Sequence, residues 1–315
     1  MAAPDPLDRR LLVVTGKGGV GKSTVAAALA LRAARAGKKV LVCEADAQER
    51  IAPLLGARPS GPIAHEVRPG LHTVNVQPPA AMREYGVMVL RFKALYDAVF
   101  ENRVMRYFLR AVPGLAELVI LGKVLYEAKV RDRTPRGEEA KLRWDLVILD
   151  APATGHAVQL LRVPQALLAT VPAGPLHSDA QWMRAMLTDA THTGIVVVTL
   201  PEEMPVNEAI DLDRELAGLE LPRVALVVNA MPATRFTPAE RERLSPLEAA
   251  PPPVGPAARA AVLQALRAEI AGRELARARE SLALPTFVLP LLGLPEWGPA
   301  AVDRVAAELG KGAAP

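Results

Sequence analysis

The chain contains very little cysteine and few aromatic residues. Cys43 is the only cysteine among 315 residues, and aromatic residues make up 4% of the sequence. One thiol cannot form an internal disulfide bond or build a cysteine-rich zinc site, so we expect a reducing, cytoplasmic setting and no structural zinc. With so few rings, leucine, valine and alanine must fill the core, and a hydrophobic content of 50% is enough for a substantial one.

Long apolar runs and a strong charge imbalance are also missing. No uncharged apolar run reaches the roughly 18 residues of a membrane span, so we expect no transmembrane helix. The first ten residues, MAAPDPLDRR, lack the apolar core of a signal peptide. The 38 basic and 34 acidic residues give a net charge of +4, and the arginines are scattered. This pattern favours a solvated surface over a nucleic-acid-binding one.

Short apolar runs rich in β-branched residues alternate with helical patterns along the chain. Such runs begin at Leu11, Lys39, Asp145, Gly194, Arg223 and Thr286. Buried strands separated by helices predict an α/β fold with a doubly wound, mostly parallel sheet. Ligands of such sheets bind at the carboxyl ends of the strands.

The sequence GKGGVGKST, residues 16–24, follows the first predicted strand and opens an alanine-rich helix. It fills the phosphate-loop pattern G-x-x-x-x-G-K-[ST], in which glycines let backbone N–H groups converge on phosphate oxygens. We expect Lys22 to reach the β and γ phosphates of ATP and the Ser23 hydroxyl to ligate Mg²⁺. A chance match is the alternative, and the strand–loop–helix context argues against it. The candidate nucleotide-binding residues of the loop are Gly16, Gly18, Gly19, Val20, Gly21, Lys22, Ser23 and Thr24.

Carboxylates lie at the ends of two predicted strands. Asp150 ends its strand in the manner of a Walker B acid, and we expect it to hold Mg²⁺ directly or through water. Asp46 starts the loop after the second strand and is placed to orient the attacking water; alternatively it is a turn or capping residue. Glu44 lies two residues earlier on the same face, and its role stays open.

Lys17 adds a second cation to a loop that already contains Lys22. An extra cation placed against the transferring group accelerates phosphoryl transfer. Lys17 comes too early in the loop to curl easily onto its own γ-phosphate. We therefore expect it to project across a two-fold interface toward a partner's nucleotide, like an arginine finger in trans. The alternative is an exposed lysine without a catalytic role.

KGGVGKST resembles the deviant Walker A motif of SIMIBI-class P-loop ATPases, which include MinD, ParA, the nitrogenase iron protein, ArsA and the guided-entry (Get) ATPases. Further stretches resemble the ArsA and Get group in its bacterial ArsA-like branch: VPGLAEL, LDAPATGHAVQLLRVP, VTLPEEMPVNEA and FVLPLLGLPEWG. The resemblance runs nearly from end to end. It implies a dimeric ATP-hydrolysing switch that couples Mg-ATP to a partner or to a hydrophobic membrane-protein client. It also implies one domain over residues 1–315 with a helical subdomain over residues 82–130.

Carried over residue by residue, the resemblance makes Lys17 the lysine that crosses the dimer and Asp46 the switch I aspartate needed for hydrolysis. Asp150 matches the switch II acid, and Asn229 matches the asparagine that recognises adenine. His156 matches a histidine with a hinge or structural role. The segment ADAQER departs from the family's switch I pattern, which leaves the finer switch I contacts open.

Several features of the family are missing. After Asn229 there is no cysteine pair to share zinc across a dimer, and Cys43 alone cannot bind arsenite as ArsA does. ArsA usually fuses two ATPase halves, and this chain corresponds to one. The short stretch after Pro164 is thin for a client groove. Residues 82–130 either form that groove or pack as core or dimer contact, and both interpretations stay open.

The alternative function is a positioning or regulatory ATPase of the MinD or ParA kind, which uses ATP as a dimerisation signal. The final AVDRVAAELGKGAAP is too short and too weakly charged for the membrane helix of MinD. The Arg-rich segment from Arg267 to Arg279 keeps ParA-like DNA binding open. The sequence leaves open the client, and whether the chain pairs with itself or with a paralogous ATPase.

Overall fold

The computed structural model describes residues 5–45, 48–90, 114–132, 141–294 and 296–313. Within these ranges, eight strands form one sheet in the order β3-β4-β2-β5-β1-β6-β7-β8. Every neighbouring pair is parallel except β3 with β4. The strands span Leu11–Gly16 (β1), Val40–Ala45 (β2), His65–Arg68 (β3), Leu71–Val76 (β4), Leu146–Asp150 (β5), Thr193–Thr199 (β6), Arg223–Met231 (β7) and Thr286–Pro290 (β8).

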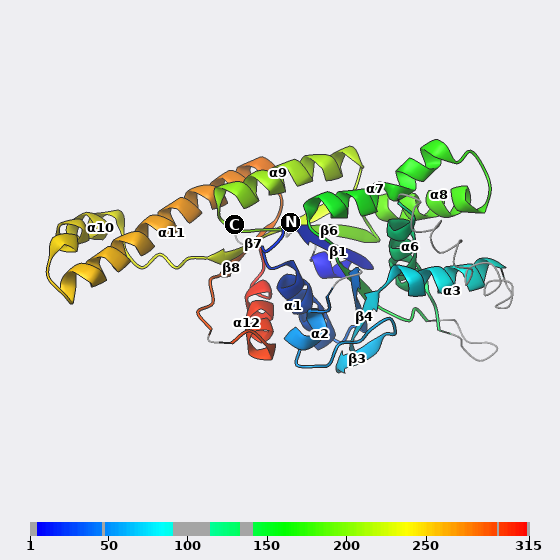
Figure 1. The fold of residues 1–315 in the computed structure, drawn as a ribbon, viewed down its shortest axis with the longest axis horizontal. Helices are drawn as coiled ribbons and strands as arrows, with labels where there is room; N and C mark the ends of the chain where they lie inside the picture. Colours follow the sequence, from blue (N-terminus) through cyan, green and yellow to red (C-terminus); the bar gives the residue numbers. More distant parts are fainter. Residues whose placement is uncertain (1–4, 46–47, 91–113, 133–140, 295, 314–315) are drawn as a thin grey trace.

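Helices cover both faces of this sheet (Figure 1). One face carries α1 (Lys22–Arg35), α2 (Ile51–Leu54) and α12 (Pro299–Leu309). The other carries α6 (Leu115–Lys129), α7 (Thr154–Thr170), α8 (Pro175–Thr188), α9 (Glu203–Gly218) and the inner part of α11 (Val254–Leu282). Helix α3 (Pro78–Leu90) packs beside α6, and α10 (Pro238–Leu244) packs on the far end of α11. These layers confirm the predicted doubly wound α/β class.

Strand β1 shows why the central strands are continuously apolar. Leu11 and Val13 lie in the core on one face of the sheet, whereas Leu12 and Val14 lie in the core on the other. Successive side chains of a strand point to opposite faces, so a strand covered on both sides needs apolar residues at every position. The run LLVV satisfies that demand.

The sequence predicts six of these strands and misses β3 and β4. These two form a hairpin around Gly70, which has a left-handed φ of 73°. Strand β4 has the sequence LHTVNV, whose polar residues do not indicate a buried strand. Thr73 is nevertheless fully buried, and its hydroxyl shares a hydrogen bond with Ser60. When a buried polar residue has a hydrogen-bond partner that is distant in the sequence, the apolar pattern does not indicate that the residue is buried.

A proline-rich stretch precedes α11. Residues 245–249 form a 3₁₀ turn, and α11 starts at Val254. Prolines in the first turn of a helix lose no helical hydrogen bond, so a proline-rich stretch can contain a helix start. Helix α6 belongs to the predicted helical subdomain over residues 82–130, and its Leu118, Leu121 and Leu125 are buried in the core. Residues 91–113 of that predicted subdomain lie outside the described residues.

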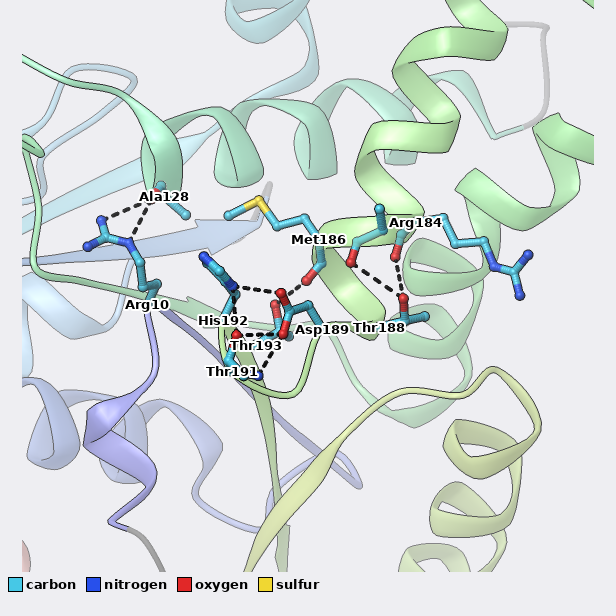
Figure 2. A network of polar contacts seen from close by, with 10 residues as sticks. Arg10, Ala128, Arg184, Met186, Thr188, Asp189, Thr191, His192 and Thr193 are labelled. Atoms are coloured by element: carbon cyan, nitrogen blue, oxygen red, sulfur yellow. Dashed lines mark hydrogen bonds and ion pairs between the residues drawn. The ribbon is translucent and has the colours of Figure 1, made fainter.

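A polar network fastens the amino-terminal edge of the sheet, opposite the glycine loop (Figure 2). The backbone N–H groups of Arg10 and Leu11 both donate to the carbonyl of His192 over 2.9 Å. The Arg10 guanidinium donates to the Ala128 carbonyl, and the Asp189 carboxylate pairs with His192.

Among the described residues, no helix combines the length and apolar content that a membrane crossing requires.

Glycine is required in β6 and replaceable in α11. A Cβ atom at Gly194 would lie 2.8 Å from Val224 Cγ2 and 3.2 Å from Leu12 Cδ2. Gly194→Ala should therefore lower the free energy of unfolding by about 1–3 kcal/mol through overpacking. At Gly272 a Cβ would meet no atom within 4 Å, so Gly272→Ala should raise it by about 0.5–1 kcal/mol. Urea unfolding of both variants tests this; equal stabilities would contradict the packing of β6 between β1 and β7.

Candidate functional site

The glycine loop follows β1 and leads directly into α1. The backbone φ angles of Gly16 and Gly21 are both positive, at 149° and 94°, which favours glycine. A Cβ atom at Gly16 would overlap the carbonyl of Val198, and one at Gly21 would overlap the Asn229 amide. Glycine is needed at these two positions because the neighbouring strands approach the loop backbone so closely. The loop is thereby held at the carboxyl edge of the sheet.

Asn229 of β7 braces the loop from one side. Its Nδ2 donates to the Val20 carbonyl over 2.9 Å, and its Oδ1 accepts from the Ala230 N–H over 2.9 Å. Ala230 has a left-handed φ of 56°, which turns the strand at this point. The structure therefore brings Asn229 to Gly21, at the amino end of α1.

Ser23 and Asp150 meet on the other side of the loop. The Ser23 hydroxyl donates to Asp150 Oδ2 over 2.6 Å, while the buried Asp150 Oδ1 has no hydrogen-bond partner among the described residues. Glu44 lies beside Asp150 in the register of β2 and β5. Its Oε1 accepts from the N–H groups of Arg50 and Ile51, but its buried Oε2 has no described partner. Asp150 Oδ1 and Glu44 Oε2 are thus two buried carboxylate oxygens without a described hydrogen-bond partner.

The electrostatics of this edge point the same way. Burial raises the pKa of Glu44 to about 7, against two backbone N–H groups that lower it. Burial also raises the pKa of Asp150 to about 6, against the Ser23 hydrogen bond and the charge of Lys22. Burial lowers the pKa of Lys22, with Asp150 opposing. The carboxylates are therefore short of positive charge, and a bound cation would favour their ionised forms.

This donor set fits Mg²⁺ held with nucleotide. Ser23 and Asp150 provide oxygen ligands, which Mg²⁺ prefers, but they leave most of an octahedral shell to water and phosphate. Among the described residues, no group of three or more His, Cys, Asp or Glu side chains is arranged to hold a metal by itself. Within the described part of the chain, the protein groups at this edge are therefore too few to complete an octahedral shell.

The two lysines of the loop point to different partners. Lys22 Nζ donates to the carbonyl of Lys17 over 3.0 Å, which places it across the loop. Lys17 Nζ forms an ion pair with Glu208 of α9. The two side chains of this pair are 30% and 37% exposed, and pairs this accessible to water contribute at most about 1 kcal/mol. Lys17 thus faces away from its own phosphate cradle and is held there only weakly.

A cavity of 460 Å³ opens beside the loop. It is lined by Gly19, Gly21, Lys22, Ser23, Thr24, Glu49, Arg50, Pro53, Leu54 and Trp297. Sequence patterns single out neither Arg50 nor Trp297. Arg50 belongs to the ADAQER segment that departs from its family pattern, and Trp297 follows the strand β8 in the C-terminal stretch. The sequence signals are the departure itself for Arg50 and, for Trp297, its place in FVLPLLGLPEWG, a stretch that carries the family resemblance.

The other predicted residues occupy different settings. Val20 is buried beneath the loop, and Gly18 lies near Ala153 at the start of α7. His156 is exposed in the first turn of α7, 3.4 Å from Gln159 Oε1. Asp46 lies outside the described residues. The structure therefore brings together the loop, Asp150 and Asn229, and leaves the position of Asp46 open.

A strand, a phosphate-binding loop and a helix, set in a parallel sheet, define the P-loop nucleoside triphosphatase class. Residues 9–172 match the model of the anion-transporting ATPase family. The matched region is more than half of the 315-residue chain, and the chain belongs to this family. The predicted ArsA-like membership is thereby confirmed.

Two relatives show the extent of the similarity. ATPase BagA of Mycobacterium tuberculosis is 34% identical over 226 residues, which cover 70% of this chain and 64% of BagA. The arsenical pump-driving ATPase of Escherichia coli is 25% identical over 235 residues, which cover 70% of this chain and 39% of that protein. The match therefore spans less than two thirds of the length of either relative.

The buried carboxylate of Glu44 gives the ligand-free chain a specific pH dependence. Its pKa in the folded chain, about 7, lies above the ordinary 4.5, so the folded chain binds more protons than the unfolded chain in this window. Stability should therefore fall as pH rises through it. Glu44→Gln keeps the oxygen that accepts from Arg50 and Ile51 but removes the charge. The variant should show a flatter decline and exceed the wild type in stability above pH 7.

Thermal midpoints measured from pH 4.5 to 8 without metal or nucleotide check this prediction. Glu280→Gln, at an exposed position of α11, is the charge-matched control and should follow the wild-type curve. If Glu44→Gln shows the wild-type slope, the orphaned carboxylate does not titrate as its burial indicates.

Proposed function

We propose that this protein hydrolyses ATP to ADP and phosphate and works as a Mg²⁺-dependent dimeric switch. The observation that carries the proposal is the glycine cradle with Ser23 hydrogen-bonded to Asp150 beside it. Membership of the anion-transporting ATPase family supports the same chemistry, as do relatives named as ATPases. Binding energy at this site comes from backbone N–H groups and from Lys22, all preorganised around one position.

Each residue then has a stated task toward ATP. Lys22 exchanges the Lys17 carbonyl for phosphate oxygens, which are stronger partners because they are charged. Ser23 and Asp150 hold Mg²⁺, whose charge supplies stabilisation of the developing phosphate charge when it is bound. Asn229, beside Gly21, contacts the adenine edge with the donor and acceptor capacity that its two backbone contacts leave. Asp46 orients the attacking water.

Lys17 serves the site of a second subunit, and the dimer is the active unit. The ammonium of Lys17 pairs with Glu208 on α9 instead of turning into its own cradle. A partner's nucleotide offers several negative oxygens in a site shielded from water, and charge-assisted hydrogen bonds of this kind contribute about 1.5–3 kcal/mol. This exceeds the value of the exposed pair with Glu208, so dimerisation can draw Lys17 away from it.

A cavity away from the nucleotide site is the proposed docking place for an apolar segment of a partner protein. It has a volume of 470 Å³, lies between α3, α6 and α8, and has mostly apolar walls that include Met82, Leu115, Leu118 and Met183. Charged side chains also line it, among them Lys123, which pairs with Glu84. Apolar walls with a few charged groups suit an amphipathic helix. We propose that the chain is one domain over residues 1–315 and that residues 82–130 form a helical subdomain within it.

The alternative function, ATP-dependent positioning on DNA, rests on the arginines of α11. Among them, Arg277 pairs with Glu274, and Glu269 of the same helix pairs with Arg241 of α10. Arginines compensated by carboxylates contribute weakly to phosphate binding. Steeply salt-dependent DNA binding would restore the alternative.

Removal of the Lys17 side chain should separate ATP binding from ATP hydrolysis. Lys17→Ala should bind ATP with wild-type affinity because Lys22 and the backbone cradle remain. Hydrolysis should fall by about 10³-fold or more, in analogy with arginine fingers. Lys17→Arg should rescue poorly because a planar guanidinium does not replace a compact ammonium. Equilibrium binding and phosphate release measure the two effects.

Mixing subunits tests whether Lys17 acts in trans. Lys17→Ala subunits are combined with Asp46→Asn subunits, each inactive alone. In the mixed dimer, the nucleotide held by the Lys17→Ala subunit lies beside an intact Asp46 and receives Lys17 from its neighbour. One competent site should reappear and restore hydrolysis. Normal hydrolysis by Lys17→Ala alone would sink the proposed role of this lysine.

Filling the apolar cavity should abolish docking and spare hydrolysis. A Cβ atom at Gly122 would lie 3.0 Å from Met183 Cε, a flexible side-chain end that can move aside. Gly122→Leu should therefore fold and place its side chain in the cavity. A fluorescent 18-residue leucine-rich peptide should bind at least about tenfold more weakly, in line with the loss of roughly 50 Å² of buried apolar contact. Gly272→Leu, at an open position of α11, is the matched control, and equal peptide binding by both variants would exclude the cavity.

A further inference from the structure

The amino-terminal part of α11 buries its small residues and exposes its large apolar ones. This part of the helix extends beyond the edge of the sheet and carries α10 (Figure 1). Three large apolar side chains are open to solvent here: Leu263 is 50% exposed, Leu266 39% and Ile270 46%. The buried positions of the same stretch are alanines, namely Ala258, Ala265 and Ala268. A helix that packs only on its own domain carries its large apolar residues on the buried face, so this arrangement indicates a further contact.

Leu263, Leu266 and Ile270 lie along one side of α11 and are called the outer stripe below. Residues three, four and seven positions apart share a face of an α-helix because 3.6 residues complete one turn. The buried alanines lie on the other side, where α10 and the 3₁₀ turn of residues 245–249 pack on the helix. The neighbouring elements therefore leave the outer stripe exposed.

Two arginines flank the outer stripe. Arg267 precedes Ile270 by three residues and Arg273 follows it by three, so both lie about one helical turn from it. Both side chains are exposed, and neither forms a hydrogen bond or an ion pair with another described residue. The nearby Glu269 is already paired with Arg241 of α10. The outer side of α11 thus combines apolar side chains with positive charge that the described residues do not neutralise.

This combination suits the surface of a lipid bilayer that contains anionic lipids. Apolar side chains of a surface helix enter the boundary between head groups and acyl chains, while arginines keep their charged ends among the lipid phosphates. DNA would engage the arginines through its phosphates but would leave the apolar side chains without a partner. A second copy of the chain would bring like charges together, and three side chains are few beside the roughly 20–30 residues a side of a stable protein interface.

We propose that the outer stripe is a membrane-surface site. Helix α11 lies on an anionic bilayer with Leu263, Leu266 and Ile270 in the head-group boundary, and Arg267 and Arg273 bind lipid phosphates. The contact is peripheral and reversible because only three apolar side chains enter the boundary. The projection of this part of α11 beyond the sheet lets it reach a flat surface (Figure 1).

Vesicle flotation of the full chain tests the role of the arginines. The chain should bind vesicles of phosphatidylcholine mixed with phosphatidylglycerol and bind vesicles of phosphatidylcholine alone much more weakly. A basic side chain near an anionic surface contributes about fivefold in affinity, so Arg267→Gln with Arg273→Gln should weaken binding at least about tenfold. Arg58→Gln with Arg304→Gln removes the same charge at exposed positions elsewhere and should bind as the wild type does.

A second pair of variants tests the apolar contribution. Leu263→Ser with Ile270→Ser should weaken binding to the mixed vesicles at least about tenfold, because the apolar area no longer leaves water. Ile63→Ser with Leu291→Ser is the matched control, since these side chains are 68% and 60% exposed and lie outside α11. All four side chains are open to solvent, so the circular dichroism of both variants should equal that of the wild type.

A fluorescent label on the outer stripe reports insertion directly. Cys43 is the only cysteine and is fully buried, so a cysteine introduced at the surface is the accessible one. Leu263→Cys labelled with the environment-sensitive nitrobenzoxadiazole group should shift its emission to the blue on addition of the mixed vesicles. The same label on Ile63→Cys should show no shift. This measurement holds even where a serine variant fails to fold.

Several results would overturn the membrane-surface site. They include no binding to either kind of vesicle, equal binding to both, and an unshifted emission of labelled Leu263→Cys. Salt-sensitive binding to a DNA duplex without vesicle binding would assign the arginines to nucleic acid instead. Dimers in sedimentation that Leu263→Ser with Ile270→Ser loses, again without vesicle binding, would assign the outer stripe to a second copy of the chain.

Discussion

The close approach of the backbone at the carboxyl end of β1 is the constraint on which the site depends. Gly16 fits against the Val198 carbonyl and Gly21 against the Asn229 amide, with no room for a Cβ atom at either position. Because β1 lies between β5 and β6, this contact also brings the loop beside Asp150. Residues far apart in sequence therefore converge because the strand order places the glycine loop at the centre of the sheet.

The charged groups at this edge are only partly paired with one another. Lys22 binds a carbonyl of its own loop and Lys17 binds Glu208, while one oxygen each of Asp150 and Glu44 has no described partner. Unpaired buried acceptors are costly, by about 1–3 kcal/mol each, whereas the exposed pair of Lys17 is worth at most about 1 kcal/mol. The balance favours a ligand that supplies a cation to the acids and an anion to Lys22.

The sequence predicts the parts of this design that depend on local pattern. Continuous apolar runs identify β1, β5, β6 and β7 because both faces of these strands are covered. The loop and Asp150 follow from their places next to those strands. Strand β4 escapes because its polar residues are satisfied by distant partners, as Thr73 is by Ser60. An apolar sequence pattern indicates which residues are buried, but it indicates their contact partners only when these are close in sequence.

Long-range partners account for what sequence alone could not provide. Glu208 lies 191 residues from Lys17, and nothing in either segment indicates that they meet. Trp297 lies in FVLPLLGLPEWG, which resembles the family, but only the packing of α12 on α1 shows that it borders the cavity. Environment, not residue type, also gives Glu44 its raised pKa, since its burial follows from the register of β2 with β4 and β5.

The contacts of Lys17 extend from the loop to the outer part of the molecule. Glu208 lies in α9, whose amino-terminal end is held by Arg277 of α11 through the Asn207 side chain and the Glu203 carbonyl. In the proposed dimer, Lys17 would leave Glu208 for a partner's nucleotide, and Glu208 would lose its cation while Arg277 stays hydrogen-bonded to the neighbouring Asn207. The same exchange that would complete a neighbouring active site thus changes the charge balance where α9 meets α11.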